Sequence, residues 1–265
     1  MRTESKVQGE APPCVILLGA SNATRGISAI VDTARQLLGG PIDVRGALGH
    51  GRSYGIKSRV LLRGLPGISR CGLWESLRVR PSAPAFALLT DLGNDILYEV
   101  PVPRIAEWVA WCLDRLQEAE ALTTITLLPT SSLERLTALH YYTARAVFFP
   151  SSRLSMARAL AEARELNHRL EELAAARNIS VVKPRGQWYG LDPIHIQIRH
   201  SRAAWGEILR SWQTRSLEPG ATTGSFRRWV KLQLLRPERW SFAGFERSRA
   251  QPCGTLPDSS TISLY

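Results

Sequence analysis

Short apolar runs alternate with longer amphipathic segments along most of the chain. The runs predict strands at residues 14–19, 42–48, 84–90, 124–129 and 179–183. Residues 24–38, 104–120 and 153–177 place apolar side chains at helical spacing, and a further helix is expected soon after residue 195. Strands that alternate with helices form a parallel sheet covered on both faces. We therefore predict an α/β fold with a central parallel sheet of about five strands.

Two segments depart from this alternation. Residues 131–150 (SSLERLTALHYYTARAVFFP) have no clean period and contain four aromatic residues. We interpret them as an insertion that either lies over a site or packs as a surface excursion. Residues 217–265 are basic, and there we predict a separate extension with a helix at 225–236 and disorder near the end, in DSSTISLY. This division leaves 1–13 as a flexible N-terminus and 14–216 as the main domain.

Composition limits the class of protein. A chain of 265 residues that is 44% hydrophobic can bury a sizeable core. Its formal net charge of +11 favours anionic partners, and the last fifty residues contain the basic stretches RRWVKLQLLRPERW and FERSRA. The N-terminal apolar run is too short for a signal peptide or a membrane span, so we expect a cytoplasmic protein. The scattered cysteines suit neither a zinc site nor a disulfide framework and are expected to be reduced thiols: Cys14, Cys71, Cys112 and Cys253.

Unusual residues follow four of the predicted strands, where ligands of parallel α/β sheets bind. The segments are GASN, GHGRS, LGNDI and YGLDPIH. Ser21 lies in the first segment, at a tight turn before a helix, where its hydroxyl is exposed and its N–H points into the positive end of the helix dipole. Two interpretations are open for Ser21: a nucleophile, or a residue that only caps the helix.

A serine nucleophile requires a general base, and His195 is the best placed of five histidines. Asp192 stands three residues before it, in a loop that Gly190 and Pro193 make tight. This carboxylate can fold back onto the imidazole Nδ1–H and leave Nε2 toward the serine. The alternative is a surface histidine beside a helix-capping aspartate.

Donors for a developing oxyanion are available at the two remaining strand ends. Gly51 can bring its N–H close to a substrate, and Asn94 offers a side-chain amide. Both residues also suit ordinary turns.

Taken in order, Ser21, Gly51, Asn94 and His195 resemble the four blocks of the SGNH or GDSL hydrolase superfamily, over residues 15–200. The resemblance implies a flavodoxin-like, three-layer α/β/α fold. It also implies that Ser21 is the nucleophile and an oxyanion donor through its N–H. Gly51 and Asn94 would be the other donors, His195 the base and Asp192 its partner.

The blocks depart from the family pattern at two positions. Ala20 stands where the first block usually has Asp, and Leu92 stands where the third usually has Gly. The missing acid at Ala20 bears on which subfamily the chain resembles and which substrate it takes more than on the reaction itself. We assign the block neighbours Asn22, Arg52 and Asp95 to substrate binding, and Arg52 favours an anionic substrate.

Two other kinds of site are disfavoured. Residues 49–55 (GHGRSYG) resemble a dinucleotide loop, but the third glycine is one residue late and the loop follows the second strand instead of the first. Asp192, His195 and His200 have no established metal-ligand spacing, so we expect no metal site.

We expect an acyl-ester hydrolase that forms a covalent acyl-Ser21 intermediate on a small-molecule ester and needs no cofactor. An acyltransferase would use the same site. An inactive binding protein is the alternative of a different class, with a tail that docks on nucleic acid or an anionic membrane. We favour packing of that tail on the domain over docking. The tail places basic residues among tryptophans: Arg227, Arg228, Trp229, Lys231, Arg236, Arg239 and Trp240.

Overall fold

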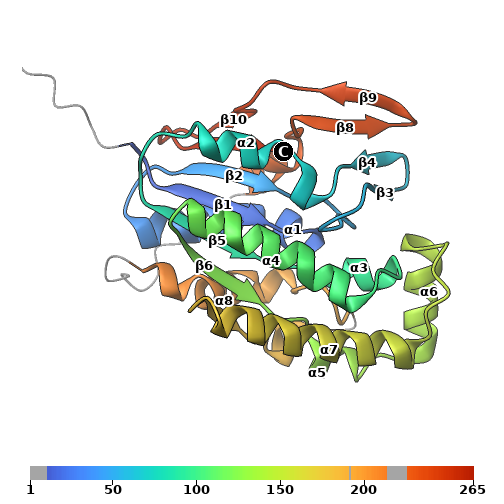
Figure 1. Cartoon of the computed structure of the whole chain (residues 1–265). Coiled ribbons are helices and arrows are strands. Elements are labelled where there is room, and N and C mark those ends of the chain that lie inside the picture. Colours follow the sequence, from blue (N-terminus) through green and yellow to red (C-terminus); the bar gives the residue numbers. More distant parts are fainter. Residues whose placement is uncertain (1–10, 191, 214–225) are drawn as a thin grey trace, which may run out of the picture.

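The computed structural model describes residues 11–190, 192–213 and 226–265, which form three layers with a seven-stranded sheet in the middle (Figure 1). The order of strands in this sheet is β10-β11-β2-β1-β5-β6-β7. All neighbours pair in parallel except β10 and β11. These strands are β1 (Cys14–Leu18), β2 (Asp43–Ala47), β5 (Ala85–Leu89), β6 (Ala121–Thr126), β7 (Ser180–Val182), β10 (Gly254–Thr255) and β11 (Thr261–Leu264).

A smaller antiparallel sheet of order β3-β4-β8-β9 lies beside the large one. Its strands are β3 (Ser58–Val60), β4 (Arg63–Leu65), β8 (Arg239–Phe242) and β9 (Phe245–Ser248). The α-helices are α1 (Ser21–Leu38), α2 (Leu73–Arg78), α3 (Asn94–Leu97), α4 (Val102–Glu118), α5 (Thr130–Leu133), α6 (Ala138–Phe148), α7 (Met156–Ala175), α8 (Ile198–Ile208) and α9 (Phe226–Gln233).

The two faces of the large sheet each have a core of their own. Along β1, Ile16 and Leu18 pack with residues of α2, α4 and α7, whereas Val15 and Leu17 pack with residues of α1, α8 and α9. Successive side chains of a strand point to opposite faces, so a strand covered on both sides is apolar throughout. This burial explains the unbroken run CVILL in β1.

The predicted fold class is confirmed, and the sheet has two more strands than expected. The five predicted strands correspond to β1, β2, β5, β6 and β7, and their order along the sheet, 2-1-3-4-5, is that of flavodoxin-like folds. The boundaries of the other four strands agree within one residue, but β6 spans 121–126 where the sequence predicts 124–129. The difference arises because the apolar residues Leu127 and Leu128 are buried beyond the strand, in the wall of a pocket.

The prediction of a separate C-terminal extension with a disordered end is wrong. β11 pairs in parallel with β2, from Thr261 beside Asp43 to Leu264 beside Gly46, and so belongs to the central sheet. Ile262 and Leu264 are buried and alternate with hydroxyl residues, a strand pattern that the polar composition of DSSTISLY conceals. The proposed boundary at 216/217 lies outside the described residues.

The predicted tail helix is present as α9, which packs on α1. Arg228 donates to the Ser28 hydroxyl, and the Trp229 indole N–H donates to the carbonyl of Arg25.

All four cysteines are free and buried. Within the described ranges, no helix has the length and apolar character needed to span a membrane.

Candidate active site

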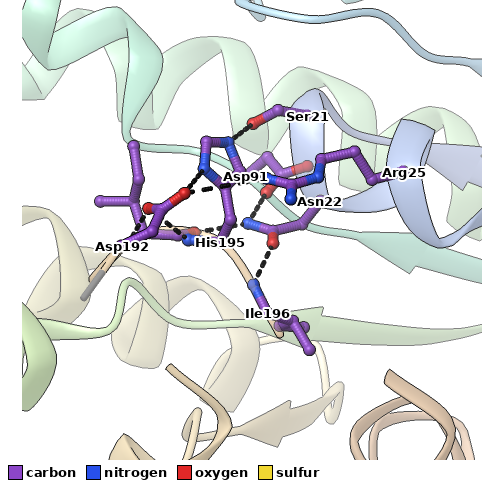
Figure 2. Close-up of polar contacts among 8 residues, drawn as sticks. Ser21, Asn22, Arg25, Asp91, Asp192, His195 and Ile196 are labelled. Atoms are coloured by element: carbon purple, nitrogen blue, oxygen red, sulfur yellow. Dashed lines mark hydrogen bonds and ion pairs between the residues drawn. The ribbon is translucent and has the colours of Figure 1, made fainter. Parts of the chain in front are cut away.

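Ser21 is the first residue of α1, directly beyond the carboxyl end of β1. Its hydroxyl lies 2.9 Å from Nε2 of His195, which comes from the loop before α8 (Figure 2). Ala20 occupies the N-cap position, and that position has no side-chain cap. The Ser21 N–H belongs to the first turn of the helix, where N–H groups have no helical acceptor. The geometry therefore leaves the hydroxyl directed to an imidazole and the N–H available to a ligand.

His195 is oriented by Asp192 within one short loop. Nδ1 of His195 and Oδ2 of Asp192 are 2.6 Å apart, and the backbone N–H groups of Ile194 and His195 donate to the other carboxylate oxygen at 3.2 Å. Partial burial raises the pKa of Asp192, but the hydrogen bond and charge of His195 and the two N–H donors outweigh it, so the net pKa is lowered. An ionised Asp192 fixes the tautomer with hydrogen on Nδ1, which leaves Nε2 free to accept from Ser21.

Asn22 ties helix α1 to the residues on both sides of His195. Its amide N–H donates to the carbonyl of Ile194 at 2.8 Å, and its amide oxygen accepts from the N–H of Ile196 at 2.8 Å. A second N–H of the amide donates to Asp91 at 2.7 Å. Asn22 lines the pocket as predicted, but its polar atoms are engaged in holding the histidine loop. We therefore revise its assignment from substrate binding to positioning.

Asp91 is a site residue that the sequence analysis missed. Its carboxylate accepts from the backbone N–H groups of Ala20 and Ala23 at 2.8 and 3.1 Å, so it caps α1 from the end of β5. It also has a positive φ of 61°, an uncommon conformation for a residue other than glycine. Thus Asp91 supplies a carboxylate at the helix end where Ala20 lacks one. The available sequence signal was the acid in TDLGND, directly after a predicted strand.

Arg25 and His50 also lie near the site without having been predicted. Arg25 is 3.8 Å from the Asp192 carboxylate, and both side chains are about half exposed. Desolvation is the main cause that lowers the pKa of His50, and electrostatic interactions with His195, Arg63 and Arg25 add to it against an opposing effect of Asp91. His50 is therefore held toward its neutral form close to the imidazole of His195.

The two expected oxyanion donors lie in adjoining loops. The amide of Asn94 lines the pocket and donates one N–H to the carbonyl of Arg52 at 3.3 Å, which leaves its second N–H for another acceptor. Gly51 has a φ of +62°, and a Cβ there would lie 2.4 Å from the Val60 side chain, so the loop requires glycine. Gly51 is not among the described residues that line the pocket, although its neighbour Arg52 is bonded to Asn94.

The assignment of Arg52 to substrate binding is wrong. Its side chain is fully buried, and its guanidinium donates to the carbonyls of Leu48 and Pro66 and to the main-chain oxygen of Tyr265. A guanidinium held by three carbonyls beneath the loop cannot meet a substrate. Arg52 instead joins the loop after β2 to the end of β11, and the expectation of an anionic substrate loses its support.

Asp95 is likewise structural and does not bind substrate. It is fully buried and accepts from the Ser53 hydroxyl and from the Tyr54 N–H, which fixes the loop after β2. Burial raises the pKa of Asp95 to about 6, although both hydrogen bonds oppose the rise.

The raised pKa of Asp95 makes a prediction about stability. Between pH 4 and pH 6 the folded chain binds more protons at this site than the unfolded chain, whose value is 3.8, so its contribution to stability falls as pH rises. The difference between the folded and unfolded pKa values of Asp95 corresponds to a loss on the order of 3 kcal/mol in the free energy of unfolding. Urea unfolding of wild type and Asp95→Asn across this range should show the wild type losing stability relative to the variant. Parallel pH curves would contradict this.

A pocket of about 450 Å³ contains Ser21, Asn94 and His195 in its wall. The insertion at 131–150 contributes one side of this pocket. Of the two interpretations of the insertion, the structure therefore favours one that lies over the site. Tyr141 and Arg145 anchor the insertion by donating to the carbonyl of Leu154, just before α7. The wall residues from helices α5 to α7 and their flanks are mostly apolar and include Leu133, Leu136, Tyr141, Phe149, Met156 and Leu160.

No protein-family model matches the sequence, and a sequence comparison finds no matching curated protein. Solved structures do match. The native aryl esterase of M. smegmatis has a TM-score of 0.52 at 15% identity, over 78% of this chain and 100% of that chain. A carbohydrate acetylesterase family member from Sinorhizobium meliloti also has a TM-score of 0.52 at 15% identity, over 74% of this chain and 95% of that one. The chain has the SGNH-hydrolase fold.

Within the SGNH fold, the departures at Ala20 and Leu92 have structural explanations. Asp91 provides the carboxylate at the start of α1, and Leu92 is buried in the core between the sheet and α4. Neither departure disturbs the chain of hydrogen bonds from Ser21 through His195 to Asp192.

Proposed function

We propose that the protein is a serine-dependent ester hydrolase. The observation that carries this proposal is the continuous chain of hydrogen bonds from the Ser21 hydroxyl through both ring nitrogens of His195 to Asp192, beside an apolar pocket. A hydroxyl that donates to an imidazole whose other nitrogen is held by a carboxylate is an activated nucleophile. A capping serine has no need of such partners.

In the first half of the reaction, the Ser21 oxygen attacks the carbonyl carbon while His195 Nε2 takes the hydroxyl proton. The tetrahedral oxyanion accepts hydrogen bonds from the Ser21 N–H, the Asn94 amide and the Gly51 N–H. Collapse breaks the bond to the alcohol oxygen, which leaves with the proton from His195, and acyl-Ser21 remains. The hydrogen bond between Asn94 and Arg52, next to Gly51, supports the grouping of these donors.

In the second half, His195 takes a proton from water, and the resulting hydroxide attacks the acyl carbon. Collapse then releases the acid and returns the proton to Ser21. Asp192 remains ionised throughout and stabilises the imidazolium that forms in each half. The lowered pKa of Asp192 supports this role.

The pocket favours an ester with an apolar acyl chain. Aliphatic side chains such as Leu133, Met156 and Leu160 surround a space of about 450 Å³, of which an acetyl group would fill a small part. Each methylene buried contributes roughly 0.8 kcal/mol, about fourfold in an equilibrium or rate constant. We therefore expect kcat/KM to rise with chain length until the pocket is filled.

A series of p-nitrophenyl esters from acetate to dodecanoate tests this proposal. Ala159 on α7 is half-buried and lines the pocket, so Ala159→Phe should remove the gain for the longest chains and leave acetate hydrolysis close to wild type. The matched control is Ala157→Phe on the exposed side of the same helix, which should keep the wild-type profile. A wild-type protein that hydrolyses acetate as well as it hydrolyses octanoate would refute the assignment of the acyl chain.

A further inference from the structure

Two hairpin turns of the small sheet present large apolar side chains to solvent. Leu61 and Leu62 form the two-residue turn between β3 and β4, and they are 85% and 57% exposed. Phe242 and Phe245 are opposite each other at the end of the β8–β9 hairpin, and they are 51% and 70% exposed. We call these four residues the apolar tips.

The apolar tips form one surface. β4 pairs with β8 so that Arg63 lies beside Phe242, and the Ala243 N–H donates to the Leu62 carbonyl at 2.9 Å. Both turns point to the same side of the molecule, on the right of Figure 1, where α6 also lies. The two hairpins are far apart in the sequence, so their apolar turns meet only through the fold.

The residues at these turns are unfavourable choices for a turn in water. Leu61 has a φ of +54°, a conformation that favours Gly or Asn, and hairpin turns are normally built from small polar residues. A strained and exposed Leu-Leu turn gains nothing for folding. Exposed apolar groups concentrated at one surface indicate a binding site.

The charge around the apolar tips identifies the partner. Residues 57–63 and 239–249 contain six Lys and Arg and a single acid, Glu246, which pairs with Lys57. Among the cations, Arg59, Arg239, Arg247 and Arg249 are exposed. Apolar side chains that enter a bilayer, flanked by cations that meet anionic headgroups, are the two components of interfacial membrane binding.

We propose that the apolar tips and their flanking arginines dock the protein on an anionic lipid surface. Like charge opposes the pairing of two copies through this face, and aliphatic Leu61 and Leu62 offer nucleic acid no stacking surface. The surface adjoins the loop after β2, since Val60 of β3 lies against the position of Gly51. Docking does not depend on the proposed ester hydrolysis.

Vesicle sedimentation of the full chain tests this proposal. The wild type should sediment with vesicles of mixed phosphatidylcholine and phosphatidylserine, less with phosphatidylcholine alone, and less as salt increases. The tip variant replaces all four apolar tips. It carries Leu61→Asn and Leu62→Ser, which suit the turn, and Phe242→Thr and Phe245→Thr, which suit the strands. We expect the variant to bind anionic vesicles at least tenfold more weakly, a change of about 1.4 kcal/mol or more.

The controls separate docking from folding. The melting temperature of the tip variant should match or exceed that of the wild type because its turn residues are better suited to their conformation. Val79→Ser with Leu234→Ser removes exposed apolar side chains that lie outside the two hairpins and should leave vesicle binding unchanged. The proposal is overturned if the wild type does not bind anionic vesicles, or if the tip variant binds as the wild type does. It is equally overturned if the tips serve instead to form a dimer in solution or to bind single-stranded DNA.

Discussion

Replacing Ser21 with alanine should lower kcat/KM for ester hydrolysis by about 10⁴-fold or more. In the proposed mechanism, the substitution removes the oxygen that forms the acyl-enzyme bond and the proton that His195 accepts. Residual activity would come from water activated within the same pocket. Steady-state kinetics on the preferred p-nitrophenyl ester gives the comparison.

The control for Ser21→Ala is a serine that does cap a helix. The Ser155 hydroxyl accepts from the Arg158 N–H at the start of α7. Ser155→Ala should cost roughly 1 kcal/mol in the free energy of unfolding and leave activity unchanged. Ser21→Ala should show the reverse pattern, with little change in stability and nearly complete loss of activity. If Ser21→Ala costs stability as Ser155→Ala does and leaves activity intact, Ser21 is only a helix residue.

Asp192→Asn should lower kcat/KM on the order of 10³-fold. An amide can donate to Nδ1 of His195, which moves the ring hydrogen to Nε2 and removes the acceptor for the Ser21 proton. We place the loss below that of Ser21→Ala because Asp192 is 51% exposed, and water can partly take its place. The proposed mechanism has Ser21, His195 and Asp192 act as a unit, so Ser21→Ala combined with Asp192→Asn should be no less active than Ser21→Ala alone.

Asp114 is a closely matched control for Asp192. Its side chain is 50% exposed and paired with Arg177, on α4 and away from the pocket. Asp114→Asn should retain wild-type kinetics. Equal activity of the Asp192→Asn and Asp114→Asn variants would show that the contact between Asp192 and His195 has no part in the reaction.

The main features of the fold were predictable because burial on both faces leaves a clear mark in the sequence. β1 and β5 are continuous apolar runs, and α1 and α4 have an apolar face. The strand β11, which lies between β10 and β2, was not predictable in the same way. It has only four residues, and its hydroxyl residues Thr261 and Ser263 make it resemble a polar tail until its pairing with β2 is known.

The candidate site was predictable to the extent that strand ends meet at one edge of a sheet. Ser21, Asn94 and His195 come together for that reason. The direction of neighbouring side chains was not predictable, since adjacent residues in a loop can point oppositely. Arg52 and Asp95 follow block residues directly but turn into the interior.

Asp91 shows a further limit of sequence reasoning. Its role depends on how β5 lies against the start of α1, because the hydrogen bond from the Ala20 N–H to Asp91 joins residues 71 positions apart in the chain. The sequence signals were an acid directly after a predicted strand and the lack of an acid at Ala20, and neither places the Asp91 carboxylate at the start of α1.

Covalent labelling with a fluorophosphonate tests the assignment of Ser21 most directly. The reagent reacts rapidly with a serine whose proton is taken by a neighbouring base, so it reports activation of the hydroxyl without knowledge of the substrate. Peptide mass mapping of the folded protein should find one adduct, on Ser21, absent from Ser21→Ala and strongly slowed in Asp192→Asn. A folded wild-type chain that stays unlabelled, or carries the adduct on another residue, would contradict the proposed serine mechanism.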